Sequence, residues 1–387
     1  MWGDIAIAFT IAFLTTLMTT PLTIKLANKV GAVDTPQDER RINKITMPRL
    51  GGLAVIAGFI VSVAYLLITM TIESKINLFD NDEYGRKLVG FAVGGLIIMA
   101  VCLYDDIKGA PAIAKLIAQI IAACVVIKLG GIKIENVSIP WFNWLENQIF
   151  YKILTVGWIV GITNAINLID GLDGLSTGIT LIACISLLVI FSLNSSPIIA
   201  ILLITALAGS LVGFLPYNFN PAKTFIGDTG SNFLGYCISV ISILGIAKTY
   251  TAIVIVAPII VLLLPIFDTL SSIVRRLITG KSIKAVFKPD ANHLHHKLLK
   301  SGFTQKQVVL LLYGLTATLG IFTVIFMESG AWKALSFAIL VIIIIAVGYK
   351  EFFRQKLLGT SSEDDFEQIE TPEETESKIP KKHRVEK

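Results

Sequence analysis

The feature that most constrains this chain is a series of long apolar segments that recur along almost its whole length. A helix needs roughly 20 apolar residues to cross the ~30 Å hydrocarbon core of a bilayer, and only helices and closed barrels satisfy their backbone polar groups there. Segments of about that length lie at residues 4–24, 50–70, 88–104, 112–129, 152–169, 177–193, 197–215, 231–247, 250–273, 307–327 and 332–350. Since hydrophobic residues make up 54% of the chain and charged residues 16%, an ordinary soluble domain is excluded. We therefore predict an all-α, polytopic integral membrane protein with about eleven transmembrane helices. Ten is the competing count, because two of the segments are short or polar at one end.

Charged residues beside the apolar segments predict the orientation of the chain in the membrane. Asp4 precedes the first segment and basic residues follow it. A secretory signal peptide has the reverse order, so this segment is expected to remain as a helix. Lys and Arg favour the cytoplasmic side, which places the N-terminus outside and the C-terminus inside. The loops then predicted to be inside, 25–49 and 274–306 among them, are rich in Lys and Arg, whereas the outside loops 71–87 and 130–151 carry few cations.

Polar residues gather at the ends of the apolar segments on the predicted cytoplasmic side. They occupy four stretches, "LYDDIKG" (103–109), "NAINLIDGLDGLSTG" (164–178), "PYNFNPAKTFIGDTGSN" (216–232) and "FKPDANHLHHKLL" (287–299). Ionisable residues at membrane depth are unfavourable and usually functional. The clustering therefore predicts a site at this face.

The first stretch contains two adjacent carboxylates, Asp105 and Asp106, at the C-terminal end of a predicted helix. A helix C-terminus carries partial negative charge, so two acids there need a compensating cation. A metal ion, Lys108, Lys44 or a cationic loop would serve. The alternative is a solvated turn with no functional role.

The second stretch places Asn164, Asn167 and Asp170 at three-residue spacing, which puts them on one helical face. Gly171 then allows the backbone to approach a ligand, and Asp173 follows. Asparagines that only bond neighbouring helices are the structural alternative. That alternative does not account for the two aspartates.

The third stretch carries Asp228, which alone is best read as a helix N-cap. Together with carboxylates from the other loops, its oxygens suit Mg²⁺, which takes carboxylates plus substrate phosphates. Phe225 offers an aromatic face for a base, and Asn218 lies on the same predicted loop.

The fourth stretch holds three of the four histidines, His293, His295 and His296. His293 and His296 have the spacing of a shared helical face. Three imidazoles could bind zinc. Beside an acidic site, contact with phosphate oxygens or proton transfer is the favoured interpretation.

These parts together indicate phosphoryl-type transfer between a nucleotide-linked donor and an acceptor dissolved in the bilayer. The rival from another class is a transporter. Acids on a translocation path usually lie near the bilayer midplane, whereas these cluster at one face.

The four stretches, in this order and with "KITMPRLGG" (44–52), resemble the polyprenyl-phosphate N-acetylhexosamine-1-phosphate transferases of the glycosyltransferase family 4 type. The resemblance runs from about residue 25 to 300. The "HLHH" and "PRLGG" forms are similar to the bacterial undecaprenyl-phosphate N-acetylglucosaminyl 1-phosphate transferase branch, and the muramoyl-pentapeptide branch differs in both places.

The resemblance implies transfer of N-acetylglucosamine 1-phosphate from UDP-GlcNAc to undecaprenyl phosphate, with release of UMP. This would be the first membrane step of a cell-wall or surface polysaccharide such as a teichoic acid or lipopolysaccharide. Another UDP-N-acetylhexosamine, including UDP-MurNAc-pentapeptide, is the alternative donor. A direct attack on the β-phosphorus and a two-step route through a phosphoryl-aspartate at Asp105 or Asp106 both remain open.

The resemblance also assigns roles to individual residues. It implies metal contacts, to Mg²⁺ or alternatively Mn²⁺, at Asp228 and Asn167. The residues it implies to be catalytic are Asp105, Asp106, Asp170, Asp173, His293, His295 and His296. Those implied to bind substrate are Lys44, Asn164, Gly171, Asn218 and Phe225.

The expected setting is a bacterial plasma (inner) membrane, with the site and the C-terminus in the cytoplasm. The expected partners are the two substrates and the lipid bilayer, without nucleic acid, and a homodimer is an open alternative to a monomer. Residues 363–376 hold eight carboxylates and no cation, a composition that cannot bury a core. We therefore predict a transmembrane catalytic domain at 1–358 and a disordered, charged cytoplasmic tail at 359–387.

Overall fold

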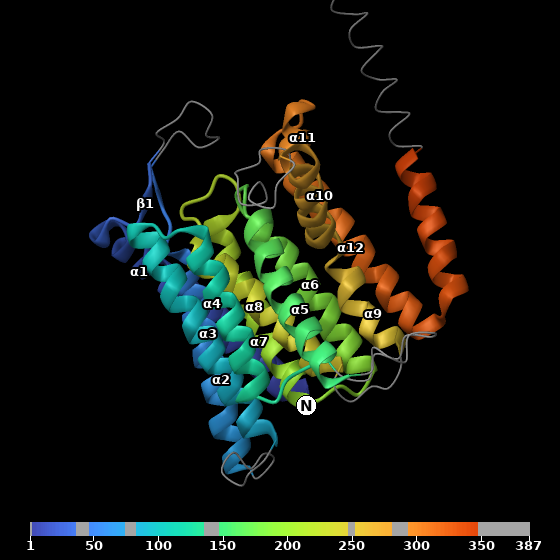
Figure 1. The fold of residues 1–387 in the computed structure, drawn as a ribbon, viewed down its shortest axis with the longest axis horizontal. Coiled ribbons are helices and arrows are strands. Elements are labelled where there is room, and N and C mark those ends of the chain that lie inside the picture. The colour runs from blue at the N-terminus through green and yellow to red at the C-terminus, as the bar shows by residue number, and fades with distance from the viewer. Residues whose placement is uncertain are drawn as a thin grey trace, which may run out of the picture. The chain divides into compact units, whose positions relative to one another are not determined.

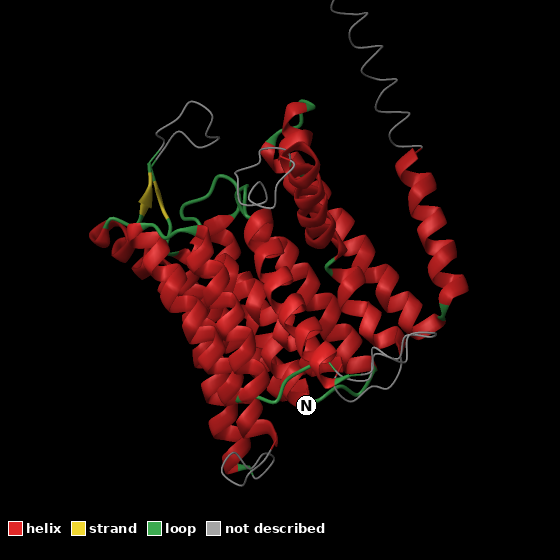
Figure 2. Cartoon of the chain, in the orientation of Figure 1, coloured by secondary structure: helices red, strands yellow, loops and turns green. Residues whose placement is uncertain are grey.

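The computed structural model describes residues 2–35, 46–73, 83–134, 147–246, 252–280 and 293–346. The regular elements in this part of the chain are helices apart from one short pair of strands (Figures 1 and 2), which confirms the predicted all-α class. The helices are α1 (Trp2–Val30), α2 (Gly51–Ile72), α3 (Glu83–Lys108), α4 (Ala112–Lys128), α5 (Gln148–Ile169), α6 (Leu175–Leu193), α7 (Ile198–Asn218), α8 (Gly227–Ile246), α9 (Ala252–Val261), α10 (Leu263–Gly280), α11 (Leu294–Lys300) and α12 (Gln305–Ser329), and a further apolar helix spans Ala331–Ala346. Strands β1 (Val33–Asp34) and β2 (Met47–Pro48) pair antiparallel.

Each predicted apolar segment coincides with helix over its described residues, although one of them is divided. The segment 250–273 becomes α9 and α10, which meet at Leu262. Pro265 has no N–H for the carbonyl of Val261, and a proline ring crowds that carbonyl, so a continuous helix is broken there. The boundary follows from this proline rather than from hydropathy.

Seven of the described helices are long and apolar enough to cross a membrane by length and composition, namely α1, α2, α3, α5, α6, α7 and α12. The chain is therefore a multi-pass membrane protein. Helix α4 has 17 residues and α8 begins with a polar turn, so the number of crossings, eleven or ten, stays a prediction.

The chain divides into two compact units, residues 1–330 and 331–387. The first unit holds all four polar stretches, and the second contains the helix at 331–346. The predicted disordered tail at 359–387 lies outside the described residues, so the boundary after residue 358 also stays a prediction.

Helices α7 and α8 form the centre of the first unit. Residues along α7 are buried on every face, and α8 is fixed against α2 and α3 by an aromatic cluster of Phe59, Phe91, Phe233 and Tyr236. The Tyr236 hydroxyl donates to the Phe91 carbonyl at 2.6 Å, which satisfies a polar group that would otherwise be unpaired in an apolar core. This packing fixes the position of α8, and therefore of its first turn, relative to α2 and α3.

One end of the first unit collects the polar stretches. The strand pair and α11 lie at this end, away from the N-terminus (Figure 1). The loops after α3, α5 and α7 end there as well, because these helices run in the same direction as α1.

Candidate active site

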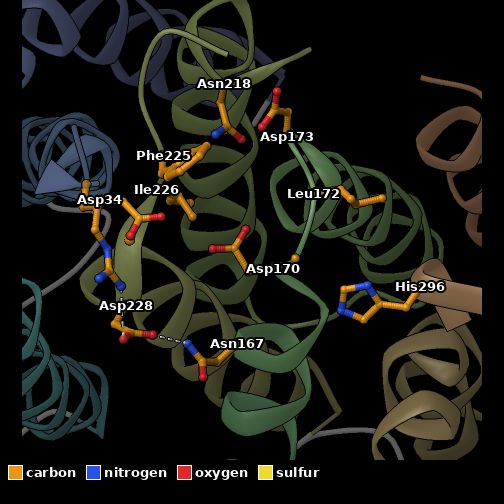
Figure 3. Close-up of a pocket in the computed structure, with 13 residues that line it drawn as sticks. Asp34, Asn167, Asp170, Leu172, Asp173, Asn218, Phe225, Ile226, Asp228 and His296 are labelled. Atoms are coloured by element: carbon orange, nitrogen blue, oxygen red, sulfur yellow. Dashed lines mark hydrogen bonds and ion pairs between the residues drawn. The ribbon is translucent and has the colours of Figure 1, made fainter. Parts of the chain in front are cut away.

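A cavity of about 420 Å³ opens at this end of the first unit. It is lined by Asp34, Arg49, Asn167, Asp170, Gly171, Leu172, Asp173, Asn218, Phe225, Ile226, Gly227, Asp228 and His296. Figure 3 shows Asp228, Asn167 and Asp170 turned toward a common space, with Phe225 and Asn218 to one side and His296 across from them. The structure therefore brings together residues of the second and third predicted stretches and one histidine of the fourth, whereas Asp105 and Asp106 of the first stretch are not among the lining residues.

The C-terminal end of α5 supplies two of these side chains. The Asn167 amide donates to Asp228 Oδ1 at 2.7 Å and to Ser231 Oγ at 2.9 Å. The helix ends at Ile169, and the Asp170 carboxylate accepts a hydrogen bond from the Ser176 hydroxyl at 2.5 Å. Asn167 and Asp170 thus face the same cavity, as their spacing predicts.

Burial raises the pKa of Asp170 to about 7. The negative charges of Asp228 and Asp106 act in the same direction, and the Ser176 hydroxyl and Arg49 act against it. The Asp170 carboxyl therefore retains a proton near neutral pH chiefly because burial disfavours its charged form.

Asp228 lies in the first turn of α8, half-buried at the edge of the cavity. Its Oδ2 lies 3.1 Å from Lys115 Nζ and 3.7 Å from an Arg49 guanidinium nitrogen. The carboxylate therefore has a cation from α4, a cation from the β2–α2 loop and the amide of Asn167 around it.

The adjacent acids at the end of α3 have separate partners. Asp106 accepts from the backbone N–H of Asp228 at 3.0 Å and from the N–H and hydroxyl of Thr229 at 2.9 and 2.6 Å. Asp105 accepts from Lys115 Nζ at 2.8 Å and from Ala110 N–H at 2.5 Å. Asp106 therefore caps α8 from a different helix.

The structure corrects two expectations about these acids. Lys108, one of the predicted compensating cations, lies over the Tyr104 ring at 5.7 Å. Arg49 of the basic loop 25–49, as the alternative of a cationic loop predicts, compensates the acids together with Lys115 and the positive end of α8. Taken alone, the sequence predicts Asp228 as the N-cap of this helix, yet the side chain that bonds the first amides of α8 is that of Asp106. The sequence does not reveal this because the cap comes from a segment more than 100 residues away.

Close backbone contact places Arg49 beside Asp228. Gly51 and Gly52 donate their N–H groups to the carbonyls of Phe225 and Ile226 at 3.0 and 2.9 Å. A Cβ on Gly52 would lie 2.3 Å from the Cα of Gly230, so only glycine allows this approach of α2 and α8. The "PRLGG" stretch is thus a backbone clamp on the loop that enters α8.

Three of the expected site residues, Asp173, Asn218 and Phe225, surround one loop between α7 and α8. Asp173 accepts from Asn220 Nδ2 at 2.9 Å and from Ala222 N–H at 3.2 Å. Asn218 accepts from the Thr177 hydroxyl at 2.6 Å and donates to the Thr224 carbonyl at 3.1 Å. These bonds order the loop, and Phe225, which follows it, lines the cavity.

The three histidines have three different environments. His293 precedes α11 as its N-cap in extended conformation, so it does not share a helical face with His296. His293 Nδ1 lies 2.8 Å from Asp268 Oδ2, and His296 lines the cavity. His295 is buried against Gly171, where a Cβ would lie 2.4 Å from its Nε2.

His295 is neutral at neutral pH. Burial lowers its pKa to about 4, and the neighbouring His296 acts in the same direction. Within the part of the chain that the structure describes, neither of its ring nitrogens has a hydrogen-bond partner.

Asn164, an expected substrate-binding residue, is not among the residues that line the cavity. The Asn164 amide donates to Gln119 Oε1 at 2.6 Å and to the Val160 carbonyl at 2.8 Å, which is the structural alternative of an asparagine bonding a neighbouring helix. Lys44 lies outside the described residues.

The oxygen donors of the cavity fit Mg²⁺ better than zinc. In the described ranges, no group of three His, Cys, Asp or Glu side chains is arranged to hold a metal ion, as a closed zinc site requires. Mg²⁺ needs only one or two carboxylates because substrate phosphates and water complete its shell. Asp228, Asp170 and Asn167 offer such donors, and Mn²⁺ prefers the same oxygen chemistry.

Four residues near the site were not predicted from the sequence: Arg49, Lys115, Asp34 and Asp268. A signal existed for Lys115, because a lysine inside an apolar segment is unfavourable unless it has a partner. Asp268 likewise lies inside an apolar segment. Nothing in the sequence indicates that Asp34 reaches the cavity.

Comparison with known proteins identifies relatives of this chain. Residues 88–246 match the sequence model of glycosyl transferase family 4. Over 349 residues, 89% of this chain and 90% of the relative, the chain is 37% identical to a Bacillus subtilis protein named probable undecaprenyl-phosphate N-acetylglucosaminyl 1-phosphate transferase.

Two further relatives differ in their named activities. A decaprenyl-phosphate N-acetylglucosaminephosphotransferase of Mycobacterium leprae is 32% identical, with 80% of each chain covered. A phospho-N-acetylmuramoyl-pentapeptide-transferase of Staphylococcus epidermidis is 30% identical, with 81% of this chain and 95% of the relative covered.

Proposed function

Because the chain belongs to glycosyl transferase family 4, as an enzyme that transfers a hexosamine 1-phosphate to a polyprenyl phosphate, we propose that its donor is UDP-GlcNAc and its acceptor undecaprenyl phosphate. The family is one of enzymes, which removes the transporter alternative. The products are then undecaprenyl-diphospho-GlcNAc and UMP, and the reaction starts a cell-wall or surface polysaccharide.

The choice of donor rests on the relatives and on two motifs. The relatives with names that specify N-acetylglucosamine are 37% and 32% identical to this chain, and the relative named for the muramoyl pentapeptide is 30% identical. The "PRLGG" and "HLHH" stretches favour the same donor.

The observation that carries the proposal is the set of charges around Asp228. Its carboxylate meets Lys115, Arg49 and Asn167 at the edge of a cavity that Phe225 and His296 also line. Alternating carboxylates and cations are the arrangement that a diphosphate and its counter-ion require.

A divalent cation, which we propose to be Mg²⁺, would be held by Asp228, with Asn167 and Asp170 beside it. When bound it would neutralise the diphosphate and stabilise the charge that develops on the leaving group. Mn²⁺ is expected to substitute, because it accepts the same ligands.

The surroundings of the paired acids favour direct attack over a phosphoryl-aspartate. Three hydrogen bonds from residues 228 and 229 occupy both Asp106 oxygens, and Lys115 and Ala110 bind Asp105. The acceptor is a phosphate monoester that is already mostly ionised at neutral pH, so it needs orientation more than deprotonation. Its oxygen attacks the β-phosphorus of UDP-GlcNAc, the bond from that phosphorus to the bridging oxygen breaks, and the oxygen leaves with UMP.

The test is UMP release by purified protein given undecaprenyl phosphate with either UDP-GlcNAc or UDP-MurNAc-pentapeptide. We expect release with UDP-GlcNAc, its loss after chelation and its recovery with added Mg²⁺. Asp228→Asn should lower kcat by on the order of 100-fold or more, as for removal of a main electrostatic group. Release from the muramoyl donor alone would overturn the proposed substrate, and release that persists without divalent cations would overturn the proposed metal.

A further inference from the structure

We propose that Asp268 is a positioning residue for the substrate cavity, which acts through His293 and the N-terminus of α11. The inference rests on the proposed function, because it concerns how the histidines of that same site are placed. Asp268 does not line the cavity.

The contact between Asp268 and α11 uses both carboxylate oxygens. Oδ2 lies 2.8 Å from His293 Nδ1, and Oδ1 accepts from the Leu294 backbone N–H at 2.8 Å. Asp268 and His293 are 6% and 5% exposed. One carboxylate thus holds a side chain and the first amide of the helix at once.

Because Asp268 and His293 are buried, loss of this contact is strongly unfavourable. A buried carboxylate is strongly unfavourable without partners, and its removal from a buried pair leaves the other group unpaired. If α11 moved away, Asp268 would lose both of the hydrogen bonds that it makes to residues 293 and 294.

Helix α11 needs such an anchor because it is too short to be stable alone. It has seven residues, well under the ~12–15 that an isolated helix requires. Its apolar face packs on the core through Leu294, Leu298 and Leu299. That packing holds the helix against the bundle, and the bond from Asp268 fixes its first turn.

The first turn of α11 carries the residues that meet the site. His295 packs against Gly171, and His296 lines the cavity. A change in the position of Leu294 is transmitted directly to both, because they follow it in the same turn. Asp268 therefore fixes the wall of the cavity opposite Asp228 without touching it.

The first measurement is hydrogen–deuterium exchange of residues 294–300 in the full-length protein without substrate. Asp268→Ala should speed exchange in this segment, whereas the isosteric Asp268→Asn, which retains an acceptor for the Leu294 N–H, should stay close to the wild type. Thr269→Val is the matched control, since Thr269 is the next buried residue on α10. Unchanged exchange in Asp268→Ala would overturn the anchor.

The second measurement is a double-mutant cycle with Asp268→Ala and His293→Ala on UMP release. Each single variant should lower kcat/KM by on the order of 10- to 100-fold, as when a group that orients a functional side chain is lost. The kcat/KM of the double variant should be no lower than that of the less active single variant, because the effects of two residues that act through one contact are not additive. Additive losses, or faster exchange with unchanged kcat/KM, would overturn the positioning role.

The two measurements separate this inference from the proposed function. If the wild type releases UMP from another UDP-hexosamine, the proposed donor fails and the cycle is run with that sugar. If the wild type releases no UMP, the proposed function fails, and exchange alone decides whether Asp268 anchors α11.

Discussion

Asp105 and Asp106 are neighbours in the chain, yet their surroundings assign them different tasks. Asp106 binds the first backbone amides of α8, and Asp105 binds Lys115. Lys115 also contacts Asp228. Asp106 therefore supports the fold of α8, whereas Asp105 shares the cation Lys115 with Asp228.

Asparagine substitutions should separate these tasks. Asp106→Asn turns an amide toward N–H donors, so we expect a loss of about 1–3 kcal/mol of stability, the value for charge-assisted hydrogen bonds, together with a loss of activity. Asp105→Asn should lower kcat with a smaller change in the melting temperature. Thermal unfolding in detergent and UMP release on the same samples check both, and equal melting temperatures for the two variants would contradict the cap.

Asp170 predicts how stability depends on pH. Its pKa of about 7 in the folded protein exceeds the usual value near ~4 of the unfolded chain. The folded state therefore keeps a proton that the unfolded state loses, so this contribution to stability is full below pH ~4 and is lost as pH rises through ~7.

Asp170→Asn should remove that dependence. The melting temperature of the variant should exceed that of the wild type by a few degrees at pH 8 and match it near pH 4. Ser176→Ala is the companion variant, because it removes the hydroxyl that bonds the ionised form of Asp170. This change should raise the pKa of Asp170 further and extend to higher pH the range over which the melting temperature falls. A wild-type melting temperature that rises between pH 5 and pH 8 in a way that Asp170→Asn abolishes would contradict the assignment.

At the level of elements, the first turn of α8 is held by two other helices. Helix α3 supplies the cap, and the start of α2 contacts its backbone through Gly52 and Gly230. The turn that carries Asp228 is therefore held at its backbone amides by Asp106 and along one face by α2.

A methyl group at Gly52 tests this contact. Gly52→Ala places a Cβ 2.3 Å from the Cα of Gly230, and backbone cannot give way as a flexible side chain does. We expect a loss of about 1–3 kcal/mol, the range for overpacking, and reduced UMP release. Gly161→Ala on α5 is the control, because its Cβ meets nothing within 4 Å. Equal stability of the two variants would show that α2 and α8 tolerate separation.

The elements themselves follow well from the sequence. Apolar length predicts the helices because it is a local property, and the three-residue spacing of Asn167 and Asp170 correctly places both at the cavity. The break at Leu262 and the cap by Asp106 depend on a single ring and on a distant helix, so hydropathy does not reveal them. The expected role of Asn164 is unsupported for a similar reason: its amide is used by Gln119 on another helix.

For the whole molecule, the described residues of the candidate site all lie between Asp34 and His296. The polar stretches predicted this gathering because each pair of membrane-crossing helices returns the chain to the same face, so that alternate loops lie together. The sequence does not show which of these residues contact one another, since cation–carboxylate contacts such as Arg49–Asp228 depend on how the helices pack.

Removal of the predicted tail tests how much of the chain the site requires. A protein that ends at residue 358 should keep kcat/KM for UMP release within about twofold of the full-length chain, since a charged segment with almost nothing apolar to bury contributes no core packing. UMP release and membrane insertion measured in parallel check this. A loss of activity in a correctly inserted, truncated protein would assign the tail a direct role.

The pairing of Asp228 with Lys115 and Arg49 has a consequence for inhibitor design. An organic cation on an inhibitor aimed at Asp228 would compete with Lys115, Arg49 and the proposed Mg²⁺, so it would exchange one ion pair for another and gain little affinity. The aromatic face of Phe225 is the better anchor. Compounds built outward from it toward the wall that carries His296 would gain contact area without competing against the protein's own charges.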